Sequence, residues 1–235
     1  MLPEWESIPT RLQIPEVRPY FELLRGKRFQ LLIKRLFDLF VSMVLILLFS
    51  PIILVVSCLI YREDKGPVFF RQCRSTALGK EFKVIKFRTM KQEQQTKALQ
   101  LTLQNDNRIT FIGKKIRARR LDEIPQLFNI FLGEMSFVGT RPEVPYYVAS
   151  YTPEMMATLL LPAGLTSKAS IAFRNEDTIY ADHPQLHPDE VYMKYILPKK
   201  MEYNLESLAH FSLWRDCKVL LETLRSVMFK YHVDR

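Results

Sequence analysis

The residues best suited to chemistry are two adjacent carboxylates, Asp122 and Glu123, in a strongly basic region. The basic residues that precede them are Arg108, Lys114, Lys115, Arg117, Arg119 and Arg120. A carboxylate that approaches a phosphate needs nearby cations, because they offset the repulsion between like charges. Mg²⁺ prefers one or two carboxylates together with substrate phosphates, so Asp122 and Glu123 are candidate metal ligands. Arginine binds phosphate through two donors and lysine acts as a point charge, so the candidate phosphate-binding residues are Lys86, Arg88, Arg117 and Arg141.

A structural interpretation of the acidic pair stands beside the chemical one. Apolar residues recur at helical spacing up to Gly133, and Pro125 stands where a first turn tolerates it. We therefore expect Asp122 and Glu123 at a helix N-terminus, where the helix dipole favours their ionised forms. Because acidic residues commonly stabilise such a terminus, the pair alone leaves both interpretations open.

Composition limits the class of protein. The chain has 235 residues, 48% of them apolar and 25% charged, with 7 Gly and 14 Pro, which excludes collagen and low-complexity disorder. The net charge of +9 favours anionic partners such as phosphates, nucleic acid or acidic lipid. The three cysteines, Cys58, Cys73 and Cys217, lie far apart, so we expect neither a disulfide framework nor a zinc site.

One segment is apolar enough to enter a membrane. Residues 39–61 carry no charge, and a straight helix of that length at ~1.5 Å per residue reaches about 30 Å. Basic residues flank both ends, which favours a helix that enters and leaves through the same leaflet. Pro51 removes a backbone donor and Ser50 can take up the freed carbonyl, so these two residues are the expected break. A kinked helix that crosses the bilayer remains the alternative.

The remaining pattern predicts an α+β fold. Residues 68–70 and 82–87 resemble two strands of a β-hairpin, and 91–104 a helix or a connection. A short strand is expected over 134–138, and a helix over 213–229. The expected organisation is an N-terminal extension over 1–27, a re-entrant helix–break–helix over 28–62, and a mainly helical cytoplasmic catalytic domain over 63–235.

Five motifs in order raise the chemical interpretation above the structural one. They are Gly66-Pro67-Val68-Phe69-Phe70-Arg71-Gln72, Lys86-Phe87-Arg88-Thr89-Met90, Asp106-Asn107-Arg108-Ile109-Thr110, Leu121-Asp122-Glu123-Ile124-Pro125-Gln126-Leu127, and Gly133-Glu134-Met135-Ser136-Phe137-Val138-Gly139-Thr140-Arg141-Pro142. With the membrane segment upstream, this series resembles the bacterial sugar transferases, the small monotopic polyprenyl-phosphate phosphoglycosyl transferases. The resemblance runs from about Lys34 to about Leu224. Departures from the usual pattern at Arg120, Thr140 and residues 165–167 leave the donor sugar open.

The resemblance implies the transfer of a sugar 1-phosphate from a UDP-sugar to polyprenyl (undecaprenyl) phosphate with release of UMP. It implies Asp122 as the nucleophile that forms a covalent phosphosugar intermediate, and Glu123 as the Mg²⁺ ligand. It implies that the four basic residues Lys86, Arg88, Arg117 and Arg141 bind phosphate, and Arg141 matches the family motif most directly. It implies supporting roles for Gln72, Pro142 and Asp216. It also implies the cytoplasmic face of a bacterial inner membrane, contact with membrane lipid, and a role in starting polysaccharide or glycoconjugate assembly.

Three other interpretations of the sequence carry less weight. A membrane-tethered protein that binds nucleic acid or a protein partner through the basic run 108–120 lacks any recognised nucleic-acid module, so no nucleic-acid partner is expected. A conventional glycosyltransferase would release UDP rather than UMP. His183 and His187 have the spacing of helical metal ligands, but Pro184 and Pro188 break that helix, so a polar loop is expected.

Overall fold

The computed structural model describes residues 2–91 and 108–233, and within them the fold is α+β and mostly helical. The strands are β1 (Phe69–Ser75), β2 (Glu81–Phe87), β3 (Met135–Val138) and β4 (Ala163–Thr166). The α-helices are α1 (Arg18–Arg25), α2 (Arg28–Asp64), α3 (Phe111–Ala118), α4 (Gln126–Leu132), α5 (Pro145–Val148), α6 (Lys168–Ala172), α7 (Asp177–Ala181), α8 (Pro188–Val191), α9 (Leu197–Ala209) and α10 (Leu213–Val233). Short 3₁₀ turns and a π-helical turn, Tyr192–Ile196, join them. The predicted α+β class is confirmed, whereas most of the expectation for 91–104 lies outside the described residues.

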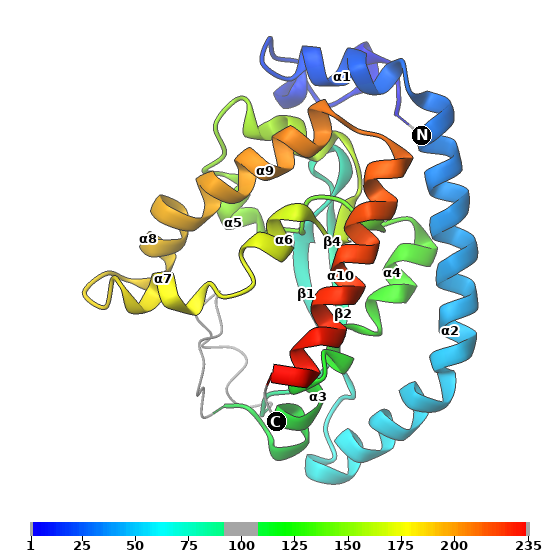
Figure 1. The fold of residues 1–235 in the computed structure, drawn as a ribbon, viewed down its shortest axis with the longest axis vertical. Coiled ribbons are helices and arrows are strands. Elements are labelled where there is room, and N and C mark those ends of the chain that lie inside the picture. Colours follow the sequence, from blue (N-terminus) through cyan, green and yellow to red (C-terminus); the bar gives the residue numbers. More distant parts are fainter. Residues whose placement is uncertain (1, 92–107, 234–235) are drawn as a thin grey trace.

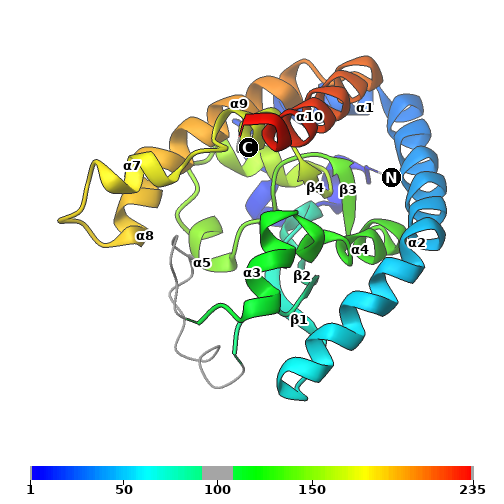
Figure 2. The same ribbon diagram turned by 60° about the horizontal axis from the view of Figure 1, so that its bottom comes forward.

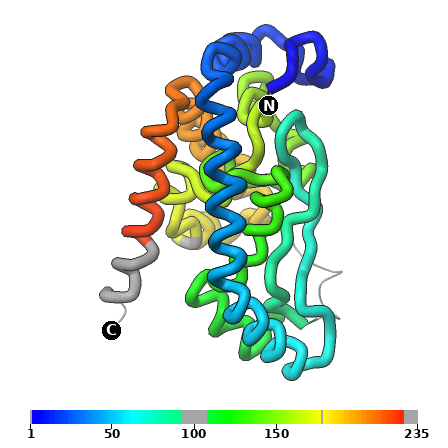
Figure 3. Tube along the Cα trace, turned by 90° about the vertical axis from the view of Figure 1, so that its right-hand side faces the viewer, coloured from blue at the N-terminus to red at the C-terminus, as the bar shows by residue number. Residues whose placement is uncertain are grey.

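Helix α2 lies along one side of the rest of the molecule (Figure 1, Figure 2 and Figure 3). It has 37 residues, or roughly 55 Å at ~1.5 Å per residue. The side chains on its inner face are buried, namely Leu31, Lys34, Asp38, Ser42, Val56 and Ile60. Its outer face exposes large apolar side chains, with Leu47 68% and Leu54 66% exposed. The helix is long and apolar enough to cross a membrane, and only 11% of its most apolar window is buried, unlike the core helix of a soluble protein.

The predicted break at Pro51 is a bend within one continuous helix. Residues 28–64 remain helical, and Figure 1 shows α2 changing direction in its lower half. Pro51 has no N–H for the carbonyl of Leu47, and the Ser50 hydroxyl donates to that carbonyl at 2.8 Å. A single lost backbone bond that a neighbouring hydroxyl replaces bends a helix without ending it.

The predicted hairpin is confirmed. Strands β1 and β2 pair antiparallel, from Phe69 opposite Phe87 to Ser75 opposite Glu81. Alternation along β2 sends Phe82 and Val84 into a core with α4, while Phe87 packs with Val56 and Ile60 of α2. The hairpin therefore joins helix α2 to the turn that carries the acidic pair.

A second sheet, which the sequence pattern did not predict as a pair, joins β3 and β4 in parallel. The two strands meet at a close backbone approach, because a Cβ on Gly164 would lie 2.2 Å from the Gly139 nitrogen. Gly139 N donates to Thr166 O at 3.0 Å, and Gly164 N to Thr140 O at 2.8 Å. These bonds fix the start of the loop that leads to Arg141.

Residues 2–25 belong to the folded core. Leu12, Val17, Phe21 and Leu24 are fully buried in a cluster that includes Phe211. Figure 1 shows α1 lying across the top of the molecule between α2 and the α9–α10 end. These N-terminal residues thus connect the start of α2 to helices α9 and α10.

This packing predicts a stability effect. We expect Leu12→Ala to lower the free energy of unfolding by about 2–5 kcal/mol, because it leaves a cavity in a fully buried cluster. Thermal unfolding of the full chain in detergent measures it, and Glu16→Ala, at an exposed position of the same segment, is the matched control. Equal unfolding temperatures for Leu12→Ala and the parent would show that this segment is not part of the core.

Candidate active site

The acidic pair lies in the 3₁₀ turn Leu121–Glu123, between α3 and α4. The sequence predicted that the pair lies at a helix N-terminus, whereas the structure places it in a separate turn and α4 begins at Gln126. That turn closes through the bond from Ile124 N to Leu121 O at 3.2 Å. Arg120 enters it with a left-handed backbone, φ 57°, a conformation uncommon outside glycine and often found at functional sites.

Glu123 is held by two cations that come from different elements. Lys86 Nζ on β2 donates to its Oε1 at 3.1 Å, and Arg141 Nη2 on the loop after β3 donates to the same oxygen at 2.6 Å. The Glu123 side chain is 16% exposed. Burial by itself raises its pKa, but the charges of Arg141 and Lys86 outweigh burial and hold the pKa well below its usual value. Glu123 is therefore ionised and fixed in place.

Asp122 has a different environment from its neighbour. Within residues 2–91 and 108–233 its carboxylate forms no ion pair with a basic side chain. Burial and then the charge of Glu123 raise its pKa, while Lys86 and Arg117 act in the opposite direction. The pair thus consists of one engaged carboxylate and one free carboxylate beside cations. A free carboxylate in this position is suited to attack phosphorus or to bind a cation.

The remaining predicted phosphate-binding residues divide into two groups. Arg117 at the end of α3 contributes charge to Asp122, and its Nε donates to Thr89 Oγ1 at 2.8 Å. Arg88 forms an ion pair with Asp64 at the end of α2, and its side chain is only 2% exposed. Among the described residues Arg88 has no hydrogen bond or ion pair with either carboxylate, so three of the four cations lie near the pair.

Arg74 was not among the residues predicted from the sequence, and it connects Gln72 and Pro142, two of the predicted supporting residues. Arg74 Nη2 donates to Gln72 Oε1 at 2.7 Å, and its Nη1 donates to the carbonyl of Pro142 at 3.2 Å. Burial lowers the pKa of Arg74, and the charge of nearby Arg141 adds to this effect. The signal available in the sequence was alternation, since Gln72 and Arg74 share one face of β1.

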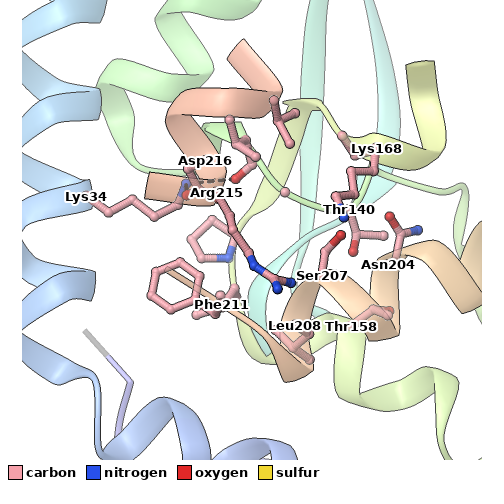
Figure 4. A pocket seen from close by; sticks show the side chains of 16 residues that line it. Lys34, Thr140, Thr158, Lys168, Asn204, Ser207, Leu208, Phe211, Arg215 and Asp216 are labelled. Carbon is pink, nitrogen blue, oxygen red and sulfur yellow. Dashed lines mark hydrogen bonds and ion pairs between the residues drawn. The ribbon is translucent and has the colours of Figure 1, made fainter. Parts of the chain in front are cut away.

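Asp216 lies elsewhere in the structure. It pairs with Lys34 of α2 at 2.6 Å, and Lys34 also donates to the Val138 carbonyl at 2.9 Å. This pair lines a cavity of about 60 Å³ between α9, α10 and the start of the Arg141 loop (Figure 4). Neither Asp122 nor Glu123 lines that cavity, so the cavity is separate from the acidic pair.

The donor set at the acidic pair fits Mg²⁺ with substrate ligands better than a metal cage made of protein alone. The described residues hold no cluster of three or more His, Cys, Asp or Glu side chains suited to a metal. Asp122 is free, and both cations contact the same oxygen of Glu123, which leaves Oε2 available. Two carboxylates completed by phosphate and water oxygens is a normal Mg²⁺ arrangement.

Comparison with known proteins gives one family. Residues 29–230 match the family model described as bacterial sugar transferase. The UDP-glucose:undecaprenyl-phosphate glucose-1-phosphate transferase of Klebsiella pneumoniae is 35% identical over 90% of this chain and 43% of its own length. The UDP-N-acetylgalactosamine-undecaprenyl-phosphate N-acetylgalactosaminephosphotransferase of Aeromonas hydrophila is 32% identical over 83% of this chain and 44% of its length.

A third relative is nearer in size. The exopolysaccharide production protein ExoY of Rhizobium meliloti is 32% identical over 83% of this chain and 84% of its own length. The chain therefore spans less than half of the first two relatives and most of the third.

The two environments at the acidic pair predict opposite stability effects. We expect Glu123→Gln to lower the free energy of unfolding at pH 7 by roughly 1–3 kcal/mol, because Lys86 and Arg141 lose their partner. Since the pKa of Glu123 is lowered on folding, its contribution is present above about pH 4.5, the ordinary value, and disappears as the pH falls further.

The ionised carboxylate of Asp122 is expected to have the opposite effect on the free energy of unfolding. Its pKa is raised on folding, so its ionised form is penalised at neutral pH, and Asp122→Asn is expected to unfold at the same temperature or a higher one. Thermal unfolding of both variants between pH 4 and pH 8 measures the contrast, with Asp182→Asn at an exposed position as control. A larger loss for Asp122→Asn than for Glu123→Gln would contradict it.

Proposed function

Since the chain belongs to the bacterial sugar transferase family, we propose that it transfers a sugar 1-phosphate from a UDP-sugar to polyprenyl phosphate and releases UMP. The observation that carries the proposal is the division of the acidic pair. Glu123 is fixed by Lys86 and Arg141, and Asp122 beside it is free. The names of the relatives from Klebsiella and Aeromonas support the class of donor and acceptor.

The first step is nucleophilic attack by Asp122. One carboxylate oxygen bonds to the phosphorus that bears the sugar, and the bond from that phosphorus to the bridging oxygen of the diphosphate breaks. The electron pair of that bond leaves with the bridging oxygen, which becomes a phosphate oxygen of UMP. The sugar phosphate is then held on Asp122 as an acyl phosphate ester. The nucleophile is the carboxylate form itself, so unlike a serine hydroxyl it needs no general base to activate it.

The second step returns the enzyme to its starting state. An oxygen of polyprenyl phosphate attacks the same phosphorus, and the bond to Asp122 breaks. The product is a polyprenyl diphosphate sugar, and Asp122 is again a carboxylate. One nucleophile thus serves a soluble donor and a lipid acceptor in turn, which requires a site at the membrane boundary.

The cations around the pair counter the charge of the diphosphate. The side chain of Arg141 is 40% exposed, so its guanidinium can contact a phosphate while it still faces Glu123. Lys86 and Arg117 add positive charge on the side of Asp122. Mg²⁺ held by Glu123 and Asp122 would neutralise charge on the diphosphate and the leaving UMP. Arg88, buried and paired with Asp64, is better suited to hold β2 against the end of α2 than to bind substrate.

The membrane arrangement that we propose is a helix seated in one leaflet on the cytoplasmic face of the bacterial inner membrane. The domain packs against α2 from Leu31 to Ile60, so a helix that crossed the bilayer would draw the polar domain into the hydrocarbon core. The bend at Pro51 and basic residues at both ends fit the same-leaflet arrangement.

We assign the donor only as a UDP-sugar and do not name its sugar. The two transferase relatives name different donors, UDP-glucose and UDP-N-acetylgalactosamine, at similar identity. A lipid-linked sugar diphosphate is the starting point for building a longer glycan, so we place the reaction at the initiation of polysaccharide or glycoconjugate assembly.

The nucleophile can be tested directly. We expect Asp122→Asn to lower turnover at least about 10³-fold, because an amide cannot form the phosphosugar ester. The assay uses the full chain in detergent with Mg²⁺, undecaprenyl phosphate and a panel of UDP-sugars, and it measures UMP and UDP separately. With donor labelled in the phosphate next to the sugar, label should remain on the parent protein and on Asp182→Asn, and be absent from Asp122→Asn.

Two outcomes would reject the assignment. Full activity in Asp122→Asn would remove the nucleophile from the scheme. Release of UDP in place of UMP would mean that the sugar moves without its phosphate.

The membrane arrangement has its own test. Cys58, Cys73 and Cys217 are exposed, so they are first replaced by alanine, and single cysteines are then introduced as Arg25→Cys or Lys65→Cys. A membrane-impermeant maleimide should label neither site in intact cells and both after lysis, because both helix ends face the cytoplasm. Labelling of one site from outside would establish a crossing helix.

A further inference from the structure

The cavity beside the Lys34–Asp216 pair has the chemistry of a ligand site. It lies between α9, α10, α6 and the Gly139–Thr140 segment, apart from the acidic pair. Figure 4 shows the polar ends of Asn204, Ser207 and Arg215 directed into this space. Apolar side chains, Leu208 and Phe211 among them, form another part of its wall.

The Asn204 amide is the buried polar group of this cavity. The residue is 6% exposed, and its Nδ2 donates to the Met201 sulfur at 3.8 Å. A thioether sulfur is a weak acceptor, so a buried amide with this partner retains most of its capacity for hydrogen bonding. Buried polar groups are normally satisfied, which points to a ligand or ordered water in front of Asn204.

The charges that line the cavity favour an anion. Lys34 is neutralised by Asp216 at 2.6 Å. Lys168 has only a long contact of 3.6 Å to exposed Glu206, and the guanidinium of Arg215 has no ion pair among the described residues. The lining therefore has two cations in excess, Lys168 on α6 and Arg215 on α10.

We propose that this cavity is a second ligand site that binds a phosphate group. Its volume of about 60 Å³ has room for roughly four waters, which suits one tetrahedral anion rather than a nucleotide. Arg215 and Lys168 supply the charge, and Asn204 supplies a neutral hydrogen bond from α9. The phosphate comes either from a soluble phosphate compound or from the headgroup of an anionic lipid beside α2.

The proposed site does not depend on the transferase reaction, because neither Asp122 nor Glu123 is among the described residues that line it. It lies near them in the chain, because Thr140, which lines the cavity, immediately precedes Arg141, the cation that holds Glu123.

Titration calorimetry with inorganic phosphate on the full chain in a neutral detergent tests the proposal. We expect Arg215→Ala, and Asn204→Asp, which places a negative charge in the cavity, each to weaken phosphate binding at least about tenfold. Arg225→Ala removes the same charge from an exposed position of the same helix and should bind like the parent. Arg141→Ala reports any phosphate that binds at the acidic pair.

Each result decides the question. Unchanged phosphate binding in Arg215→Ala and Asn204→Asp, or loss of all binding in Arg141→Ala alone, would overturn the proposal. To distinguish the sources, thermal unfolding is compared in nanodiscs of phosphatidylcholine with and without phosphatidylglycerol. Stabilisation by phosphatidylglycerol that Arg215→Ala abolishes identifies a lipid headgroup, and phosphate binding without that stabilisation identifies a soluble ligand. Soluble binding also predicts that phosphate raises the unfolding temperature of the parent more than that of Asn204→Asp.

Discussion

The ionised Glu123 between Lys86 and Arg141 is the interaction on which the rest of the site depends. A carboxylate with little exposure is tolerated only when cations compensate for its lost hydration, and these two come from β2 and from the loop after β3. Three segments far apart in the sequence must therefore meet at one oxygen atom. The β1–β2 hairpin, the 3₁₀ turn before α4 and the β3–β4 pair are the elements that bring them together.

This fixed charge also explains why two adjacent carboxylates have different roles. Glu123 uses the local cations, and Asp122 is left with burial and a like-charged neighbour, so its pKa moves in the opposite direction. A nucleophile for phosphorus must be ionised and yet not locked in an ion pair. Among the described residues Asp122 lies outside any ion pair, which supports the role of nucleophile that we propose for it.

Helix α2 is also connected to the segments that carry Lys86 and Arg141. Lys34 on the inner face of α2 binds Asp216 and the carbonyl of Val138, the last residue before the loop that leads to Arg141. Near its other end, Asp64 holds Arg88, two residues after Lys86. Helix α2 is thus connected near both ends to the segments that carry the cations, and the second cavity lies at the first of these connections.

The sequence alone determined the features that depend on local patterns: the apolar segment with Pro51 and Ser50, the hairpin, the strand over 134–138 and the motifs around Asp122 and Arg141. The spacing of apolar residues predicted that the acidic pair stands at the start of a helix, whereas the structure has a separate 3₁₀ turn there. Such spacing locates the end of a helix only to within about three residues. Only the tertiary structure decided that Arg88 pairs with Asp64, that Arg74 links Gln72 to Pro142, and that the Lys34–Asp216 pair borders a cavity. Those contacts join residues far apart in the chain, and the burial that selects one cation over another arises only when the helices and sheets have packed.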